Sequence, residues 1–251
     1  MANAIHAHVE GLTMCYGAKL VQRDLTFDIR AKEVLAIVGG SGCGKSTLLK
    51  HLIGLMQPSA GRICYGGQDL NTADPKALAG LRRQFGVSFQ SGALWSSMTV
   101  GENVMLPLEL FSNDGADERE QKARDKLALV GLADAFDDEP AALSGGMKKR
   151  AAIARALALD PPLLYLDEPS AGLDPLTSAQ LDELIQHLCD DLGASVVMVT
   201  HELESIFAVA DRLLFLDAET KTMLALDSPQ ALLEHGPEPV RKFLRRGKLP
   251  S

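Results

Sequence analysis

The sequence predicts an α/β fold in which a mainly parallel sheet is interrupted by an inserted block of helices. Three observations lead to this prediction. Strand-like and helix-like segments alternate from residue 34 to residue 90 and again after residue 160, a glycine-rich turn directly follows an apolar strand, and the stretch between these regions has almost no strand signal. The 251 residues suffice for one large α/β domain or two small ones, and a composition of 46% hydrophobic and 23% charged residues is typical of globular proteins.

Short strands and two helices are expected in the first 90 residues. The expected strands cover residues 5–9, 20–29, 34–38, 62–65 and 85–89. The run from Val34 to Val38 is apolar throughout, which indicates a strand buried on both faces. Apolar residues at helical spacing predict a helix over residues 46–56, and a second helix is expected to begin at Asp74 and Pro75.

Helical composition dominates the middle of the chain, with helices expected over residues 100–110, 117–130 and 146–159. The α/β alternation then resumes. Its expected elements are strands over 163–166, 195–199 and 213–216, a helix over 175–191, and a hairpin through 219–221 that leads to a helical tail. We therefore expect four regions: residues 1–90 and 161–218 as two parts of one core, 91–160 as a helical subdomain, and 219–251 as a hairpin and tail.

Charge and composition exclude several classes of protein. The net charge of −8, from 25 basic and 33 acidic residues, has the wrong sign for a general nucleic-acid binder. The four cysteines lack metal-ligand spacing, so we expect reduced thiols. No apolar run approaches the roughly 18 residues that cross a bilayer, and the first twelve residues lack the features of a secretory signal, so a cytoplasmic location is expected. The clearest basic patch consists of Arg241, Lys242, Arg245, Arg246 and Lys248.

A phosphate-binding loop is the strongest local signal. The pattern G-x-x-x-x-G-K-[ST] is matched by Gly39, Gly40, Ser41, Gly42, Cys43, Gly44, Lys45 and Ser46, called the phosphate loop below. Glycines let the backbone wrap closely around a polyphosphate, and the following helix N-terminus supplies partial positive charge. Lys45 is expected to reach the β- and γ-phosphates of a nucleotide, Ser46 to bind Mg²⁺, and Thr47 to bond the α-phosphate. Cys43 is expected to contribute its backbone and not to act as a nucleophile.

Two acids end the apolar segment from Leu163 to Leu166, where open α/β sheets have their ligand crevice. Asp167 can hold Mg²⁺ through its water shell. Glu168 can orient and deprotonate an attacking water. Taken alone, the same pair also fits a surface turn capped by acids.

These motifs resemble the ATP-binding-cassette (ABC) ATPases, and the segment Leu143-Ser144-Gly145-Gly146-Met147 makes the resemblance specific. It implies a P-loop NTPase (RecA-like) core with an antiparallel β subdomain and the inserted helical subdomain. In the family, the serine and glycines of this signature contact the nucleotide held by the opposite subunit. Met147 departs from the glutamine that is usual in the family.

The resemblance also implies roles for four further residues. Gln90 would contact Mg²⁺ or the attacking water and couple to a transporter, and Asp174 would help to arrange the dimer interface. His201, which could otherwise be a structural cap, would contact the γ-phosphate and the base. Tyr16, which could otherwise be half-buried core, would stack on adenine.

The family resemblance implies a homodimer that binds ATP and Mg²⁺ and drives an integral membrane permease from the cytoplasmic face of the inner membrane. We expect the permease to dock in an apolar groove formed by Leu94, Trp95, Met98, Val104 and Met105, although some of these residues are also suited to a helical core. A soluble ABC ATPase that acts on ribosomes or DNA is disfavoured, because there is one cassette and no large insertion. An inactive cassette is disfavoured, because the acids, lysine and histidine are present.

The signature, its continuation through residues 148–161 and the segment 240–245 are most similar to the ATPases of Mce-associated lipid transporters, including the Mla type. This similarity implies phospholipid trafficking between bacterial inner and outer membranes, with Mce-type substrate-binding and accessory subunits as partners and no nucleic acid. The alternative is import of amino acids or another small solute. The basic tail is expected to be a solvated helix or a contact with a partner subunit or anionic lipid.

Overall fold

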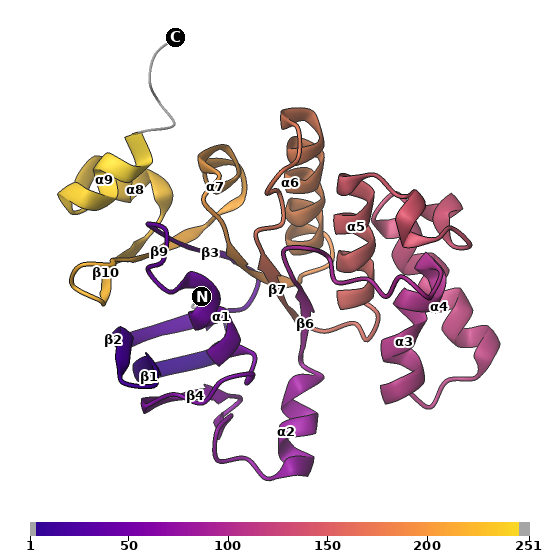
Figure 1. Cartoon of the computed structure of the whole chain (residues 1–251), viewed down its shortest axis with the longest axis horizontal. Coiled ribbons are helices and arrows are strands. Elements are labelled where there is room, and N and C mark those ends of the chain that lie inside the picture. Colours follow the sequence, from indigo (N-terminus) through magenta and orange to yellow (C-terminus); the bar gives the residue numbers. More distant parts are fainter. Residues whose placement is uncertain (1–3, 246–251) are drawn as a thin grey trace.

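A six-stranded sheet with the order β10-β9-β3-β8-β7-β6 forms the centre of the computed structural model, which describes residues 4–245 (Figure 1). Its parallel strands are β3 (Val34–Gly39), β6 (Phe85–Ser88), β7 (Leu163–Asp167), β8 (Ser195–Val199) and β9 (Arg212–Leu216), and β10 (Met223–Asp227) pairs antiparallel to β9. Every residue of β3 and β8 is buried, as expected for strands covered on both faces. The strands predicted over 34–38, 163–166, 195–199 and 213–216 are confirmed.

The first strands are longer than the sequence pattern indicates. A four-stranded antiparallel sheet, of order β2-β1-β4-β5, contains β1 (Ile5–Tyr16), β2 (Lys19–Arg30), β4 (Ala60–Tyr65) and β5 (Gln68–Asp69). Strand β1 has 12 residues where we expected five, because register shifts on both sides of Leu12 break the alternation of buried and exposed residues. The tight turn between Tyr16 and Lys19 joins β1 to β2.

Helices flank the two sheets. They are α1 (Lys45–Leu52), α2 (Pro75–Arg82), α6 (Pro175–Asp190), α7 (Leu203–Val209), α8 (Pro229–His235) and α9 (Glu238–Arg245). Helix α1 ends four residues before its predicted end, because Gly54 adopts a left-handed conformation with φ 69°. Helix α2 begins as predicted, with the Asp74 side chain accepting hydrogen bonds from the N–H groups of Lys76 and Ala77. Of the basic tail, Arg246 and Lys248 lie outside the described residues.

The central block is helical, as predicted. It comprises α3 (Val100–Phe111), α4 (Ala116–Leu129), the short helices η1 (Ala133–Ala135) and η2 (Pro140–Ala142), and α5 (Gly145–Ala156). Thr99 and Glu102 form a capping box at the start of α3. Figure 1 shows these helices together on one side of the central sheet, with α5 nearest to it.

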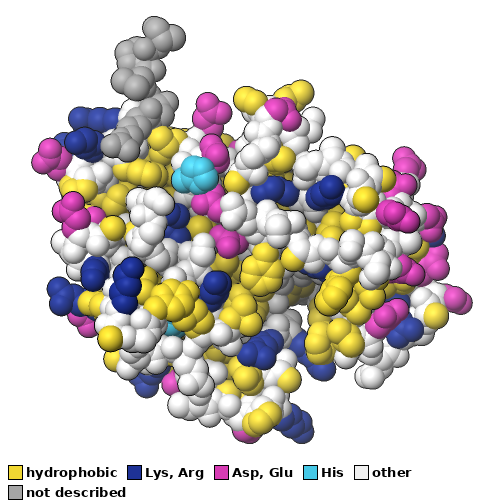
Figure 2. Space-filling view, in the orientation of Figure 1, with side chains coloured by type: hydrophobic (Ala, Val, Ile, Leu, Met, Phe, Trp, Pro, Cys, Tyr) yellow, Lys and Arg dark blue, Asp and Glu magenta, His cyan; other side chains and the backbone are white. Residues whose placement is uncertain are grey.

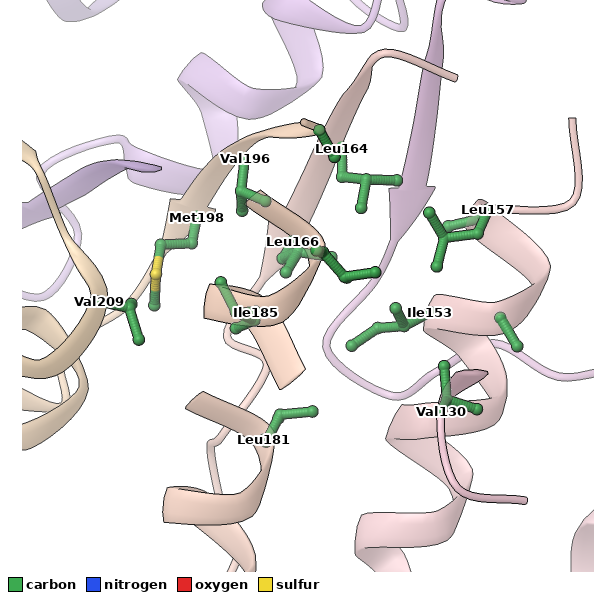
Figure 3. Close-up of a cluster of buried hydrophobic side chains, with 14 of the residues drawn as sticks. Val130, Ile153, Leu157, Leu164, Leu166, Leu181, Ile185, Val196, Met198 and Val209 are labelled. Carbon is green, nitrogen blue, oxygen red and sulfur yellow. The ribbon is translucent and has the colours of Figure 1, made fainter. Parts of the chain in front are cut away.

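Two apolar cores hold the sheet between layers. On one face, Leu164, Leu166 and Met198 belong to the same buried cluster as Leu181 of α6 and Ile153 of α5 (Figure 3). On the other face, β3, β7 and β8 share a core with α1 and the antiparallel sheet. A sheet fixed on both sides holds the carboxyl ends of β3, β8, β7 and β6 in a constant arrangement, and these ends carry the residues described next.

Candidate active site

The phosphate loop joins β3 to α1, and two of its glycines leave no room for a side chain. A Cβ on Gly39 (φ 150°) would lie 2.3 Å from the carbonyl oxygen of Leu216, and a Cβ on Gly44 (φ 106°) would lie 2.6 Å from Val21. The loop therefore wraps tightly in front of the N-terminus of α1, where unpaired N–H groups can receive an anion. A polyphosphate fits this loop.

The polar side chains of the loop already lie beside the expected metal ligand. Lys45 Nζ donates hydrogen bonds to the carbonyl oxygens of Gly39 (3.0 Å) and Gly40 (3.2 Å). Ser46 Oγ donates to Asp167 Oδ1 at 3.4 Å. Burial raises the pKa of Asp167, the neighbouring charge of Glu168 raises it further, and the Ser46 hydroxyl opposes both effects. A partly buried carboxylate beside a hydroxyl is a set of hard oxygen donors that suits Mg²⁺.

Glu168 follows β7 in an unusual backbone conformation. Its φ is 50°, a left-handed value that residues other than glycine rarely adopt. Its N–H donates a hydrogen bond to the carbonyl oxygen of Val199 at 2.8 Å. His201 follows the neighbouring strand β8, and its Nδ1 lies 2.9 Å from Oε1 and 2.8 Å from Oε2 of Glu168. The paired strand ends thus bring together two residues that are 33 positions apart in sequence.

One cavity of about 550 Å³ unites most of the predicted nucleotide-binding residues. It is lined by Tyr16, Lys19, Leu20, Val21, Ser41, Gly42, Cys43, Gly44, Lys45, Ser46, Thr47, Gln90, Glu168, Ala218 and Lys221. Tyr16 is 49% exposed at the end of β1, so its ring is free to contact a ligand. Lys19 and Lys221 were not predicted from the sequence, since each lies in or beside a hairpin turn that matches no motif. Their charges suit a polyphosphate ligand.

Ser144, Gly145, Gly146 and Asp174 lie outside this cavity. Ser144 caps α5, its Oγ accepting a hydrogen bond from the N–H of Met147 at 3.3 Å. Asp174 caps α6 by accepting hydrogen bonds from the backbone and hydroxyl of Thr177, and these bonds lower the pKa of Asp174. The chain thus brings the phosphate loop and the acids together but leaves the signature apart from them.

Gln22 contributes to the site although no sequence motif marks it. This residue of β2 is fully buried, and its Nε2 donates to the carbonyl oxygens of Cys43 (2.7 Å) and Asp217 (2.8 Å). It thereby ties the phosphate loop to the end of β9. Burial raises the pKa of the Cys43 thiol, which disfavours the reactive thiolate and agrees with a backbone role for Cys43.

The structure supports the core alternative for part of the predicted apolar groove. Val104 is fully buried in the helical core, and Leu94 and Met105 pack against that core, whereas Trp95 is 58% exposed. A different apolar cavity, of about 470 Å³, lies between α2, β6, α3 and α5. Its lining includes Leu78, Arg83, Pro107, Phe111 and Leu159. Figure 2 shows a hollow in this part of the surface, with hydrophobic side chains along one side and Lys or Arg side chains beside it.

Residues 4–245 contain no cluster of three or more His, Cys, Asp or Glu residues with the arrangement of a metal site. Among the helices of the same range, none combines the length and apolar character needed to span a membrane.

Comparison with known sequences gives a family and named relatives. The family profile described as "ABC transporter" matches residues 22–171. The "Probable ribonucleotide transport ATP-binding protein mkl" of Mycobacterium leprae is 39% identical over 97% of the chain and 70% of its own length. The "Methionine import ATP-binding protein MetN" of Cupriavidus necator is 45% identical over 78% of the chain, which spans 57% of that protein's length.

Two solved structures share the fold over most of their length. CbiO1 from Clostridium perfringens, described as part of the ABC transporter complex CbiONQ, has a TM-score of 0.84 at 28% identity, with 98% of this chain and 96% of that chain covered. The cassette MJ0796, in a dimeric post-hydrolysis state bound to ADP and Pi, has a TM-score of 0.79 at 29% identity, with 88% and 98% covered. The expected cassette fold is confirmed.

Proposed function

We propose, from the premise that this chain belongs to the ABC transporter family, that it is the ATP-hydrolysing subunit that powers a separate membrane permease. As an ABC ATPase the chain binds ATP with Mg²⁺ and hydrolyses the ATP to ADP and phosphate. The observation that carries the assignment is the cavity of about 550 Å³, in which Tyr16, the phosphate loop, Gln90 and Glu168 face one space.

In this proposal the phosphate loop and Tyr16 bind the nucleotide. The backbone N–H groups of the loop receive the phosphates, and Lys45 leaves the carbonyl oxygens of Gly39 and Gly40 to contact the β- and γ-phosphates. Thr47 bonds the α-phosphate, and Tyr16, exposed at the rim, stacks on adenine.

The proposed metal ligands are Ser46, Asp167 and Gln90. Asp167 would act through the water shell of the Mg²⁺ ion. Ser46 and Asp167 already lie within hydrogen-bonding distance of each other, and Gln90 faces the same cavity. Bound Mg²⁺ would neutralise phosphate charge and orient the γ-phosphate.

Glu168 is the proposed general base. It would take a proton from the attacking water, and its side chain, 12% exposed, is sheltered from bulk solvent. His201 would orient this carboxylate through Nδ1 and contact the γ-phosphate through its other ring nitrogen.

The signature leads us to propose a homodimer with two shared sites. Ser144, Gly145 and Gly146 do not line the cavity of their own chain, so their contact with nucleotide requires a second subunit. Asp174, which caps α6 nearby, would support the same interface. The dimeric form of MJ0796 supports this arrangement.

The apolar cavity between α2 and α3 is the proposed docking site for the permease. Phe111 is 49% exposed, and Arg83 lies 5.6 Å from its ring centroid, so the rim offers an aromatic side chain and a cation to a partner helix. Such docking would hold the chain at the cytoplasmic face of the inner membrane. Helix α9 lies on the other side of the central sheet's edge and well apart from α2 (Figure 1), so we propose a partner subunit for its basic face before the membrane around the permease.

We propose phospholipid as the cargo, moved between the bacterial inner and outer membranes with Mce-type partner subunits. The support is the signature with its basic continuation, Met147 to Arg150, and the segment 240–245. Import of a small solute is the second candidate, because relatives named for methionine import reach 45% identity.

The decisive experiment combines a Glu168 variant with purification from membranes. Glu168→Gln should bind ATP, lose turnover and accumulate as an ATP-bound dimer in size-exclusion chromatography, whereas Glu204→Gln, on the exposed side of α7, should hydrolyse ATP normally. Near-normal hydrolysis by Glu168→Gln would remove Glu168 from the role of base.

Mild detergent should co-purify a multi-spanning permease, and mass spectrometry of the complex should identify bound phospholipid. Bound methionine would favour the second candidate, and recovery of ribosomes would contradict a transport role.

A further inference from the structure

Helix α5, which begins at the signature, also contacts the turn that carries Glu168. Lys149 Nζ donates a hydrogen bond to the backbone carbonyl oxygen of Glu168 at 2.7 Å. Burial lowers the pKa of Lys149, and the charges of Glu168 and Asp167 oppose that effect. The partly buried Lys149 thus bonds the backbone of Glu168, which has a left-handed conformation directly after β7.

The same helix contacts the loop that carries Gln90. Arg155 donates through Nη1 to the carbonyl oxygen of Ala93 at 2.7 Å and through Nη2 to that of Gly92 at 2.9 Å. Ala93 also has a left-handed backbone, with φ 48°. A Cβ on Gly92 would lie 3.3 Å from the carbonyl oxygen of Lys148 and 3.6 Å from Ala152, so this loop lies directly against α5.

We infer that Lys149 and Arg155 are positioning residues, through which α5 holds the Glu168 turn and the Gln90 loop in their catalytic conformations. Each cation bonds the carbonyl groups of a strained turn, and charge-assisted hydrogen bonds are stronger than neutral ones. The inference rests on the proposed roles of Glu168 and Gln90 and adds to them two residues that do not line the nucleotide cavity.

The packing of α5 makes it a suitable support for both turns. Ala151, Ala152, Ile153 and Ala154 are buried, so the helix cannot shift without disturbing the core. Ser144, at its start, is the proposed contact to the partner's nucleotide. A displacement of Ser144 would therefore be transmitted by α5 to both the Glu168 turn and the Gln90 loop.

Hydrogen exchange of the nucleotide-free protein tests this inference without catalysis. The reporter amides are Glu168 and Ala171 for the first turn and Gly92 for the second, since they bond to Val199, Glu168 and Phe89 respectively. Lys149→Met should accelerate exchange only at the first turn, and Arg155→Met only at the second. We expect an increase of about tenfold, or about 1.4 kcal/mol.

Lys148→Met is the matched control, because Lys148 neighbours Lys149, is also half-buried, and makes no side-chain hydrogen bond or ion pair within residues 4–245. In Lys148→Met, amide exchange at both turns should equal that of the wild type. Lys149→Arg should restore slow exchange at the first turn. Unchanged exchange in both methionine variants, or equal acceleration at both turns, would overturn the inference.

Turnover provides the second readout. Lys149→Met should lower kcat about tenfold while the Kd for ATP stays within twofold, and it should cause no further loss in the Glu168→Gln background, because the group it positions is then absent. If Lys149→Met had a normal kcat while Glu168→Gln was inactive, the positioning role of Lys149 would be refuted and the proposed base would stand. An active Glu168→Gln would instead refute the proposed base.

Discussion

A buried pair of tyrosines links β4 and β7 to the end of α1, and its hydrogen bonds predict an asymmetric effect of two similar mutations. Tyr65 of β4 and Tyr165 of β7 are fully buried, and their hydroxyl groups bond to each other. Tyr65 also donates to the carbonyl oxygen of Leu52, the last residue of α1, at 2.8 Å. Tyr165 must therefore be the donor to Tyr65, which gives the hydrogen-bond chain Tyr165 to Tyr65 to Leu52.

The direction of this chain sets the size of each effect. Tyr165→Phe removes one hydrogen bond and orphans no donor, so the free energy of unfolding should fall by about 1 kcal/mol. Tyr65→Phe removes both bonds and leaves the Tyr165 hydroxyl buried without an acceptor, so the loss should be about 2–4 kcal/mol. In the double variant no hydroxyl is orphaned, and its stability should equal or exceed that of Tyr65→Phe.

Urea unfolding followed by circular dichroism measures all three variants, and thermal unfolding should show Tm reductions of about 2–4 °C per kcal/mol for a chain of this size. Phe85 lies 5.4 Å from the Tyr65 ring and 5.5 Å from the Tyr165 ring, and Phe85→Leu controls for general loss of core packing. A larger loss for Tyr165→Phe than for Tyr65→Phe, or additive losses in the double variant, would refute the assigned direction.

Three further predictions concern pH, nucleotide affinity and docking. Burial lowers the pKa of His6 below 6.5, so as the pH falls the unfolded chain binds a proton before the folded chain does. The stability that neutral His6 contributes is therefore complete above pH 6.5 and is lost as the pH falls. Urea titrations at pH 7 and pH 5 should show a smaller loss of unfolding free energy in His6→Gln than in the wild type. Gln22→Leu should raise the Kd for ATP about tenfold in calorimetry, because it frees the carbonyl oxygen of Cys43, and an unchanged Kd would contradict this role. Phe111→Asp should abolish co-purification of the permease while the Kd for ATP stays within twofold, and normal recovery would exclude this cavity as the dock.

The sequence was most informative where function resides in a continuous segment. Three motifs could be predicted in this way: the phosphate loop, the acids at the end of β7 and the signature. Each combines fixed residue types with an adjacent strand or helix in the sequence. The strands of the central sheet were predictable for a similar reason, since burial on both faces produces continuous apolar runs.

Residues that act through distant contacts were not predictable. Gln22 reaches the phosphate loop across 21 positions, and Arg155 reaches the Gln90 loop across more than 60, so neither interaction leaves a local pattern. The division of the expected groove between core and surface was not predictable for the same reason. The sequence left both uses open, and only the packing of the helices shows that Val104 belongs to the core while Trp95 is exposed.

Strand order explains which candidate residues meet within one chain. The spatial order β3-β8-β7-β6 brings the phosphate loop, His201, Glu168 and Gln90 side by side, although their order in the sequence is different. Each of them follows the carboxyl end of a parallel strand, where the sheet itself determines their neighbours. Ser144 and Asp174 begin helices instead, and the sheet does not bring them to that edge. A second copy of the chain is then needed to supply the signature, which makes dimerisation a condition of catalysis in this proposal.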